Sequence, residues 1–252
     1  PIKSSAASDV YKRQGLWSDG RYGAGREGAN IHAIVREGGY SKNTHSHLTG
    51  NVGINIIPIP GLTLSASFSP TFNFYKGKTF KKSIKYYDAK DPTIMLGYMF
   101  GYNSIKLSES RNDSYKLLAQ FIATYIKTFG SHNINITGGY EGLKSFNESL
   151  GASRDNYILD SFPYLNLGPL EYRDNSGTAN EYAYRSWFGR VIYNYKSKYL
   201  FQANVRMDGS SRFHKDHRWG TFPSFSAGWI ISEEPFYKEN GILSLSLIHI
   251  SE

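Results

Sequence analysis

The chain of 252 residues contains no cysteine. That absence excludes a disulfide framework, a zinc site built on thiolates and a cysteine nucleophile. No stretch comes near the ~18 consecutive apolar residues of a transmembrane helix, so we exclude a helical membrane protein for this segment. Transmembrane β-strands are not excluded, because each needs only ~10 residues of alternating polarity.

Acidic residues are few: Asp and Glu number 21 against 29 for Lys and Arg, a formal net charge of +8. None lies between Gly38 and Tyr87, a stretch that also contains a lysine cluster. The cluster consists of Lys76, Lys78, Lys81, Lys82 and Lys85. A solvated loop explains such a run, and anionic lipid head groups or an acidic ligand are the alternative partners. Because no RNP-type aromatic motif or helix-turn-helix pattern is present, we expect no nucleic-acid partner.

Tyrosine, phenylalanine and glycine are abundant, at 20, 15 and 25 residues. This composition suits the aromatic girdles of a membrane barrel, and it accompanies runs in which apolar and polar residues alternate, as in half-buried strands. The runs lie at 48–56, 62–74, 115–128, 133–141, 184–195, 201–208 and 225–231. The run at 62–74 is the clearest, and its one misfit, Pro70, suggests a bulge or an exit from the bilayer.

The expected connections alternate between short and long. Short turns are expected at 58–61, 129–132 and 196–198, and long loops at 75–114, 143–183 and around the polar tip 214–218. Residues 15–40 read as a loop with a short helix around 29–35. Short periplasmic turns and long extracellular loops are typical of outer-membrane barrels. The sequence therefore predicts an all-β fold, a partial transmembrane antiparallel β-barrel of about seven strands from a larger plugged barrel of ~22 strands.

Residues 198–236 carry the most regular pattern. On one face of the first strand lie Phe201, Ala203, Val205 and Met207. The other face carries Gln202, Asn204, Arg206 and Asp208, which are the candidate lumen-facing residues. If the two faces were inverted these charges would meet lipid, at a cost of ~2 to 4 kcal/mol each at mid-bilayer. The aromatic residues Tyr193, Tyr195, Tyr199 and Phe201 flank the turn 196–198 and predict an interface belt there.

The same stretch contains a dense set of motifs. They are Tyr199-Leu200, Val205-Arg206, Asp208-Gly209-Ser210-Ser211-Arg212-Phe213, Arg218-Trp219-Gly220-Thr221-Phe222-Pro223-Ser224, Ser226-Ala227-Gly228-Trp229 and Ile231-Ser232-Glu233-Glu234-Pro235-Phe236. Together they closely resemble the barrel signature of SusC/RagA-type TonB-linked (TonB-dependent) outer-membrane proteins of the Bacteroidetes. Weaker similarities extend the resemblance over residues 40–240.

The resemblance implies a nutrient importer of the cell outer membrane that takes up oligosaccharides or peptides. It implies a plug domain and TonB box elsewhere in the protein, a SusD-like surface lipoprotein as partner, and energy supplied by TonB with ExbB and ExbD. It implies no covalent chemistry, so we expect no catalytic residue, no cofactor and no resident metal.

Two other classes stay open. One is a non-transporting outer-membrane barrel, such as an adhesin or a porin-like protein, and the other is a soluble β-sandwich that binds glycans. Catalysis has a weaker case, because Asp160, Glu171, Asp174 and Glu181 are loop carboxylates whose spacing the sequence does not define. The pairs His45/His47 and His214/His217 have no third ligand at a useful spacing and read as solvated loop histidines.

The two ends of the chain read as translated sequencing adaptor. Asp9–Gln14 can be encoded as GATGTGTATAAGAGACAG, and the reverse complement of that string encodes Leu-Ser-Leu-Ile-His-Ile, the sequence of 245–250. We therefore expect residues 1–14 and 245–252 to be adaptor-derived and residues 15–244 to be the receptor β-barrel segment. The alternative is that 245–250 is a genuine apolar strand.

Overall fold

The computed structural model describes residues 19–23, 30–88, 90–91 and 93–237, together with the backbone of 246–251. The chain divides into two compact units. Unit 1 consists of Pro1–Ser46, Asn73–Asp113 and Glu148–Ala179, and unit 2 of His47–Phe72, Ser114–Asn147 and Asn180–Glu252. None of the described helices is long and apolar enough to cross a membrane.

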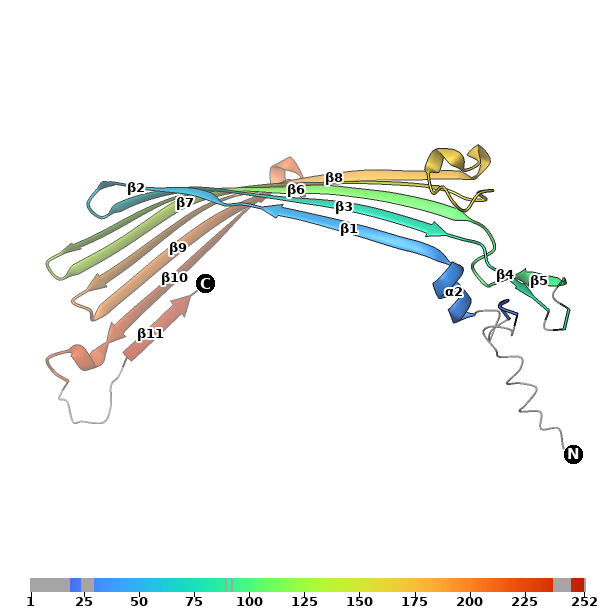
Figure 1. Ribbon diagram of the computed structural model, residues 1–252. Helices are drawn as coiled ribbons and strands as arrows, with labels where there is room; N and C mark the ends of the chain where they lie inside the picture. The colour runs from blue at the N-terminus through green and yellow to red at the C-terminus, as the bar shows by residue number, and fades with distance from the viewer. Residues whose placement is uncertain (1–18, 24–29, 89, 92, 238–245, 252) are drawn as a thin grey trace, which may run out of the picture. The chain divides into compact units, whose positions relative to one another are not determined.

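Most strands belong to one sheet in which neighbours along the chain pair antiparallel (Figure 1). Its strands are β1 (Gly39–Thr49), β2 (Val52–Ile59), β3 (Leu62–Lys81), β6 (Lys106–Phe129), β7 (His132–Arg154), β8 (Arg173–Tyr195), β9 (Tyr199–Ser210), β10 (Trp219–Ile230) and β11 (Ser246–Ser251). The order is β1-β3-β6-β7-β8-β9-β10-β11, and β2 pairs with β3. The prediction of an all-β, antiparallel partial barrel is confirmed, and the single sheet lacks the second layer of a sandwich among the described residues.

The other elements are short and lie in the connections. They are the helix α2 (Ile31–Glu37), the hairpin of β4 (Lys85–Tyr87) and β5 (Met95–Tyr98), and the single 3-10 turns η2 (Leu165–Leu167), η3 (Leu170–Tyr172), η4 (Lys215–His217) and η5 (Ile231–Glu233). The helix confirms the expected one at 29–35. Its first turn is capped by Asn30, whose side-chain oxygen accepts a hydrogen bond from the Ala33 amide at 3.2 Å.

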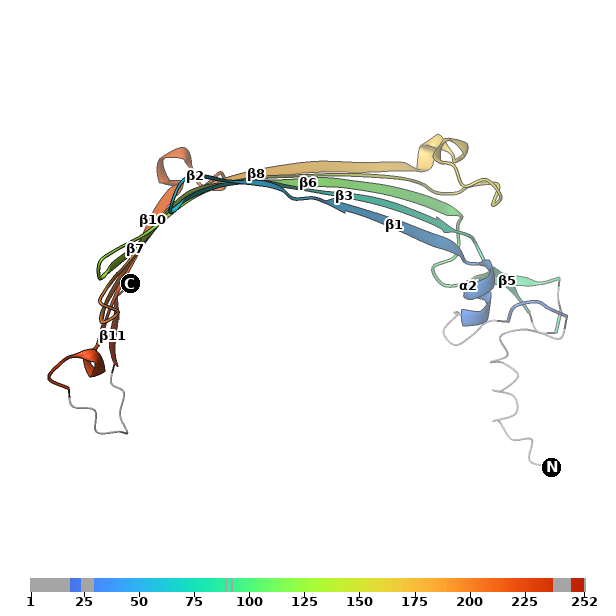
Figure 2. The same cartoon turned by 60° about the vertical axis from the view of Figure 1, so that its left-hand side comes forward.

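The short turns lie together at one end of unit 2 (Figure 2). Backbone bonds join neighbouring turns: the Lys196 amide donates to the Ser131 carbonyl and the Ile126 amide to the Gly61 carbonyl, both at 2.8 Å. Lys196 and Ser197 have φ values of 52° and 57°, the conformation that a two-residue hairpin turn requires. The short turns are thus where the alternation of polarity predicted them.

The long connections are shorter than predicted. β3 continues to Lys81 and β6 begins at Lys106, so 75–114 is largely strand and contains a small hairpin. The loop expected at 143–183 shrinks to 155–172 in the same way. Residues such as Lys, Ser, Asn and Gly have weak strand propensity, but pairing with an extended neighbouring strand supplies their hydrogen bonds and overrides propensity.

The first strands also differ from the prediction. The run at 48–56 is split between β1 and β2, which are separated at Gly50 and Asn51, and both halves pair with β3. Pro70 neither bulges β3 nor ends it. Its carbonyl accepts the Gly50 amide at 3.0 Å, at the point where the partner of β3 changes from β2 to β1. The proline is tolerated because the neighbouring strand is interrupted there.

Two small hydrophobic clusters stabilise unit 1. One packs Phe80 of β3 and Leu107 of β6 against Tyr157 of the 155–172 loop, with the Phe80 and Tyr157 rings edge to face at 6.2 Å. The other joins Ala33 of α2 to Ile84 and Met99 beside the β4–β5 hairpin. All described buried hydrophobic residues except Leu143 belong to these clusters. The strands of unit 2 therefore expose both faces.

The terminal assignment is only partly within the described residues. Residues 1–14 lie outside them, as do 245 and 252. The backbone of β11 pairs with β10 in register, with Phe225 opposite Ser251 and Ile230 opposite Ser246. A strand forms here whichever origin the segment has, so the assignment of 245–252 to adaptor stays a prediction.

Candidate functional site

Strand register divides unit 2 into an apolar face and a polar face. Residues directly opposite in an antiparallel pair share a face, so Met207 lies beside Trp187, Val205 beside Gly189 and Ala203 beside Phe225. Large apolar residues of this face are Val52, Ile54, Ile56, Leu64, Phe68, Phe121, Trp187, Val205, Met207 and Phe225. Their exposed fractions run from 39% for Leu64 to 74% for Val52. An exposed apolar surface that crosses this many strands is too large to be incidental.

The four candidate lumen-facing residues all lie on the polar face. Gln202 accepts a hydrogen bond from Arg190 at 3.1 Å, and Asn204 donates to Ser224 at 3.2 Å. Arg206 and Asp208 bond each other directly, with the Arg206 Nε 2.8 Å from an Asp208 oxygen. The four side chains share one face, as the alternation predicts, and the structure adds cross-strand partners; that this face lines the lumen stays a prediction.

A polar network centred on Arg206 spans β6 to β9. The guanidinium donates to the Ser186 hydroxyl at 2.9 Å and lies 3.5 Å from the carboxylate of Glu141. The Ser186 hydroxyl donates to Asp208, and Ser186 is fully buried. Two strands, β7 and β9, thus supply a single cation with two carboxylates on the wall of the sheet, and Ser186 of β8 bridges the Arg206 guanidinium and Asp208.

Glu141 is the second centre of the network. It accepts a hydrogen bond from the Tyr184 hydroxyl at 2.6 Å and one from the Gln120 amide at 2.5 Å. Sequence reasoning missed Glu141, Gln120, Tyr184 and Ser186. Their positions in the alternation place them on the polar face, but only the register of β6, β7 and β8 brings them to Arg206.

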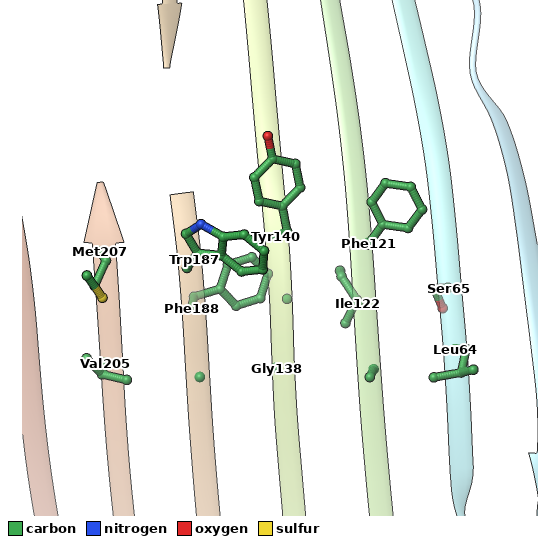
Figure 3. A pocket seen from close by; sticks show the side chains of 13 residues that line it. Leu64, Ser65, Phe121, Ile122, Gly138, Tyr140, Trp187, Phe188, Val205 and Met207 are labelled. Carbon is green, nitrogen blue, oxygen red and sulfur yellow. The ribbon is translucent and has the colours of Figure 1, made fainter. Parts of the chain in front are cut away.

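The apolar face contains a hollow of about 660 Å³. Figure 3 shows Leu64, Phe121, Tyr140, Trp187, Val205 and Met207 around it. The hollow exists because the chain has small residues, Ala123, Gly138 and Gly189, where its neighbours have rings. The Tyr140 and Trp187 rings contact each other at 4.7 Å along one side. No set of convergent polar groups lines it, so it has the chemistry of a surface for hydrocarbon rather than of a catalytic centre.

Comparison with known proteins agrees with this geometry, although no family model matches the chain. The TonB-dependent receptor P3 of Formosa agariphila is 33% identical over 190 residues, which cover 72% of this chain and 19% of that protein. The TonB-dependent receptor SusC of Bacteroides thetaiotaomicron is 34% identical over 165 residues, covering 64% of this chain and 16% of that protein. The chain belongs to the SusC/RagA-type TonB-dependent receptors. It spans less than a fifth of the length of these two relatives.

Solved structures show the same fold. The RagAB peptide transporter superposes with a TM-score of 0.69 at 21% identity, over 83% of this chain and 23% of that chain. The RagAB peptide importer in its open-open state gives a TM-score of 0.70 at 19% identity, over 94% of this chain and 24% of that chain. At such identities the likeness establishes the fold alone.

The family signature maps to the hairpin of β9 and β10. The end of β9 carries Asp208, Gly209 and Ser210, and the loop that follows begins with Ser211, Arg212 and Phe213. The rest of the signature lies in β10: Trp219, Gly220, Phe222, Pro223, Gly228 and Trp229. Two of the glycines accommodate rings. A Cβ atom on Gly209 would lie 2.8 Å from the Trp219 indole, and one on Gly220 would lie 3.0 Å from the Phe222 ring. The signature thus combines a network carboxylate with glycines that let aromatic rings lie against the backbone.

Aromatic side chains gather beside the 196–198 turn, and their place at a membrane interface stays a prediction. Tyr199 stacks on Tyr195 at 6.1 Å and on Trp229 at 6.4 Å, and Tyr193 bonds the His132 ring through its hydroxyl at 2.7 Å. Beyond the end of β10, Glu234 accepts hydrogen bonds from the Tyr199 hydroxyl at 2.5 Å and the Trp229 indole at 3.2 Å. The Tyr199 bond holds the pKa of Glu234 below its usual value. Phe201 is on the apolar face, opposite Tyr193.

The remaining candidates from the sequence do not form a site. His45 and His47 lie in β1, so the expectation of loop positions was wrong for them, and the His45 ring packs on Tyr75 at 4.7 Å. The described part of the chain holds no group of three or more possible metal ligands. Of the four carboxylates expected in a loop, Asp174 and Glu181 lie in β8, so that expectation was wrong for them. Asp160 pairs with Lys82 and Glu181 with Lys144, both at 3.1 Å.

Replacing Arg206 tests the network. In Arg206→Met, Glu141 and Asp208 lose their shared cation. We expect the free energy of unfolding to fall by about 1–2 kcal/mol, a modest value because the guanidinium is partly exposed to solvent. The matched control Arg190→Met removes an arginine of the same strand system that makes a single bond, to Gln202. Urea titration of the purified receptor measures both. Equal losses in the two variants would show that the network adds nothing beyond one hydrogen bond.

Proposed function

We propose that this chain forms part of the barrel wall of a TonB-dependent nutrient importer in the outer membrane. The observation that carries the proposal is the two-faced sheet of unit 2. Its apolar face is exposed over seven neighbouring strands, and its polar face carries paired charges. A bilayer satisfies this arrangement, because hydrocarbon covers the apolar face while strand pairing satisfies the backbone.

Strand length supports the same reading. A tilted crossing needs about 9–11 residues, whereas β3, β6, β7 and β8 contain 20, 24, 23 and 23 residues. The part next to the short turns belongs to unit 2, and the remainder of each strand extends into unit 1. We therefore assign unit 2 to the membrane and the long loops to the extracellular side. In this orientation Gln202, Asn204, Arg206 and Asp208 face the lumen.

We assign the energy source and partners by family. The cargo is an oligosaccharide or a peptide, a SusD-like surface lipoprotein is the partner, and TonB with ExbB and ExbD supplies the energy. The relatives named SusC and RagAB peptide transporter support this assignment. The relatives' names describe receptors and transporters, so we assign no catalytic step to the polar face. A non-transporting barrel such as an adhesin or porin-like protein is the alternative.

Arginine substitutions on opposite faces test the orientation. Val205→Arg places a charge near the middle of the apolar face. We expect it to reduce the free energy of unfolding by about 2–4 kcal/mol and to reduce the amount of folded receptor in the outer membrane. Ser224→Arg is the control, since Ser224 lies at a similar depth on the polar face, where it accepts a bond from Asn204. Heat-modifiable mobility on gels and urea titration report folding. If Ser224→Arg is the more damaging change, the faces are inverted.

Uptake experiments test the import function. Cells that lack the intact receptor are expected to lose uptake of one class of labelled cargo, either oligosaccharides or peptides, and a strain without TonB is expected to lose it too. Complementation with the wild-type gene is the control. Uptake that persists without TonB would support the porin-like alternative, and uptake unaffected by deletion would contradict an import role.

We also propose that residues 15–244 are the receptor segment and that 1–14 and 245–252 derive from adaptor. The support is the reverse-complement relation between the codons of Asp9–Gln14 and those of 245–250. A long sequencing read of the genomic locus is expected to show other codons at both ends. Finding the same codons in the genome would contradict the assignment and make 245–250 a native strand.

A further inference from the structure

A second cavity, of about 440 Å³, lies where β9 and β10 meet their connecting loop. Arg206 and Asp208 of β9, Tyr184 of β8 and three residues of the loop and its end, Phe213, His217 and Arg218, line it. The rings of Trp219 and Phe222 complete the lining. The volume falls in the range of small-molecule sites, about 300–1,000 Å³. Three members of the Arg206 network, Tyr184, Arg206 and Asp208, line one side of the cavity, and the loop residues line the other.

The two arginines of the cavity differ in their partners. Arg206 is neutralised by Asp208 and Glu141. Arg218 has neither an ion pair nor a side-chain hydrogen bond within the described part of the chain, and its Nε atom is buried without a partner. A buried donor without an acceptor costs free energy, so it marks a place where an acceptor is missing. Arg218 is therefore the arginine of the cavity whose guanidinium has no direct partner.

The aromatic rings of the cavity are unusually open to solvent. Phe213 is 62% exposed, Phe222 60% and Trp219 48%. Trp219 and Phe222 are held in place because their rings lie against Gly209 and Gly220. Rings that are fixed, exposed and next to an arginine form a surface for a flat or apolar group that carries an acceptor.

We propose that this cavity binds a carboxylate group of the imported cargo, with the carboxylate on Arg218 and the adjoining apolar part of the cargo on the rings of Phe213 and Phe222. The proposal rests on the import function proposed above. A carboxylate fits the planar guanidinium fork and carries one negative charge. A phosphate dianion fits less well, because Asp208 also lines the cavity and would repel it. The carboxylate comes either from an acidic sugar or from a peptide C-terminus.

Paired probes test the site in the intact, purified receptor. Isothermal titration compares glucuronic acid with glucuronamide and N-acetylphenylalanine with its amide, so each pair differs only in the charge of one group. We expect one carboxylate to bind at least about tenfold more tightly than its amide, since a charged hydrogen-bond pair is worth that factor or more. The pair that shows the preference identifies the source, sugar or peptide.

Arginine variants locate the effect. Arg218→Gln is expected to abolish the preference for the carboxylate, whereas Arg212→Gln, in the same loop, is expected to keep it. Arg212 is a matched control because it stacks on Tyr182 at 4.7 Å and does not line the cavity. Equal affinity for carboxylate and amide, no binding of any probe, or a preference that survives Arg218→Gln would overturn the proposal.

A second variant covers the case in which Arg218→Gln does not fold. Arg218→Lys keeps the charge but lacks the two-pronged donor, so the carboxylate is expected to bind more weakly while amide binding is unchanged. Unchanged affinity for both probes would overturn the site.

Uptake separates this proposal from the import function. If deletion of the receptor abolishes uptake while Arg218→Gln keeps its carboxylate preference, the import function stands and the cavity proposal fails. If the preference depends on Arg218 but deletion leaves uptake unchanged, the cavity proposal stands as a binding site and the import function fails.

Discussion

Antiparallel pairing of each strand with the next is the constraint on which the rest of this structure depends. It satisfies the backbone hydrogen bonds of the strands that have a neighbour on both sides, so their side chains do not have to do so. Because successive residues point to opposite faces, pairing in register carries one polarity across the whole of unit 2. A shift of one residue in β9 would place Arg206 among the apolar residues, and the same shift in β7 would do so for Glu141. Register is therefore the property that the polar contacts secure.

On the polar face, the charged side chains around Arg206 lie in contact with groups of opposite charge. The charge of Arg206 is paired with the carboxylates of Glu141 and Asp208. These carboxylates also accept hydrogen bonds from the hydroxyls of Tyr184 and Ser186. Such a closed network fixes the relative positions of β7, β8 and β9 and leaves the wall close to neutral. Arg218 differs from Arg206 in this respect, because its buried Nε atom has no hydrogen-bond partner.

Unit 1 is stabilised in a different way. Its strands extend beyond the length that a bilayer crossing requires, and its loop and helix are attached through the small clusters around Leu107 and Met99. The ring of Tyr157 also anchors its loop from within, since its hydroxyl donates to the Tyr164 carbonyl at 3.2 Å. These few buried residues give long connections a defined conformation, which a receptor needs in order to present a binding surface.

The sequence predicts those features of this protein that depend on residues close together in the chain, and it does not predict those that depend on residues far apart. Alternation is local, so the strands, the short turns and the separation of Arg206 from Val205 could be read directly from neighbouring residues. The signature from Asp208 to Trp229 is also local, and it was sufficient to indicate the family. The ends of β3, β7 and β8 could not be read in this way, because their polar outer residues are strand only through pairing with an extended neighbour. The partners of Arg206 required the register of four strands, and the isolation of Arg218 required knowledge of everything around it. The sequence by itself determined which side of each strand is polar, because polarity repeats every two residues; the tertiary structure decided which polar groups meet, because that depends on how strands distant in the sequence align.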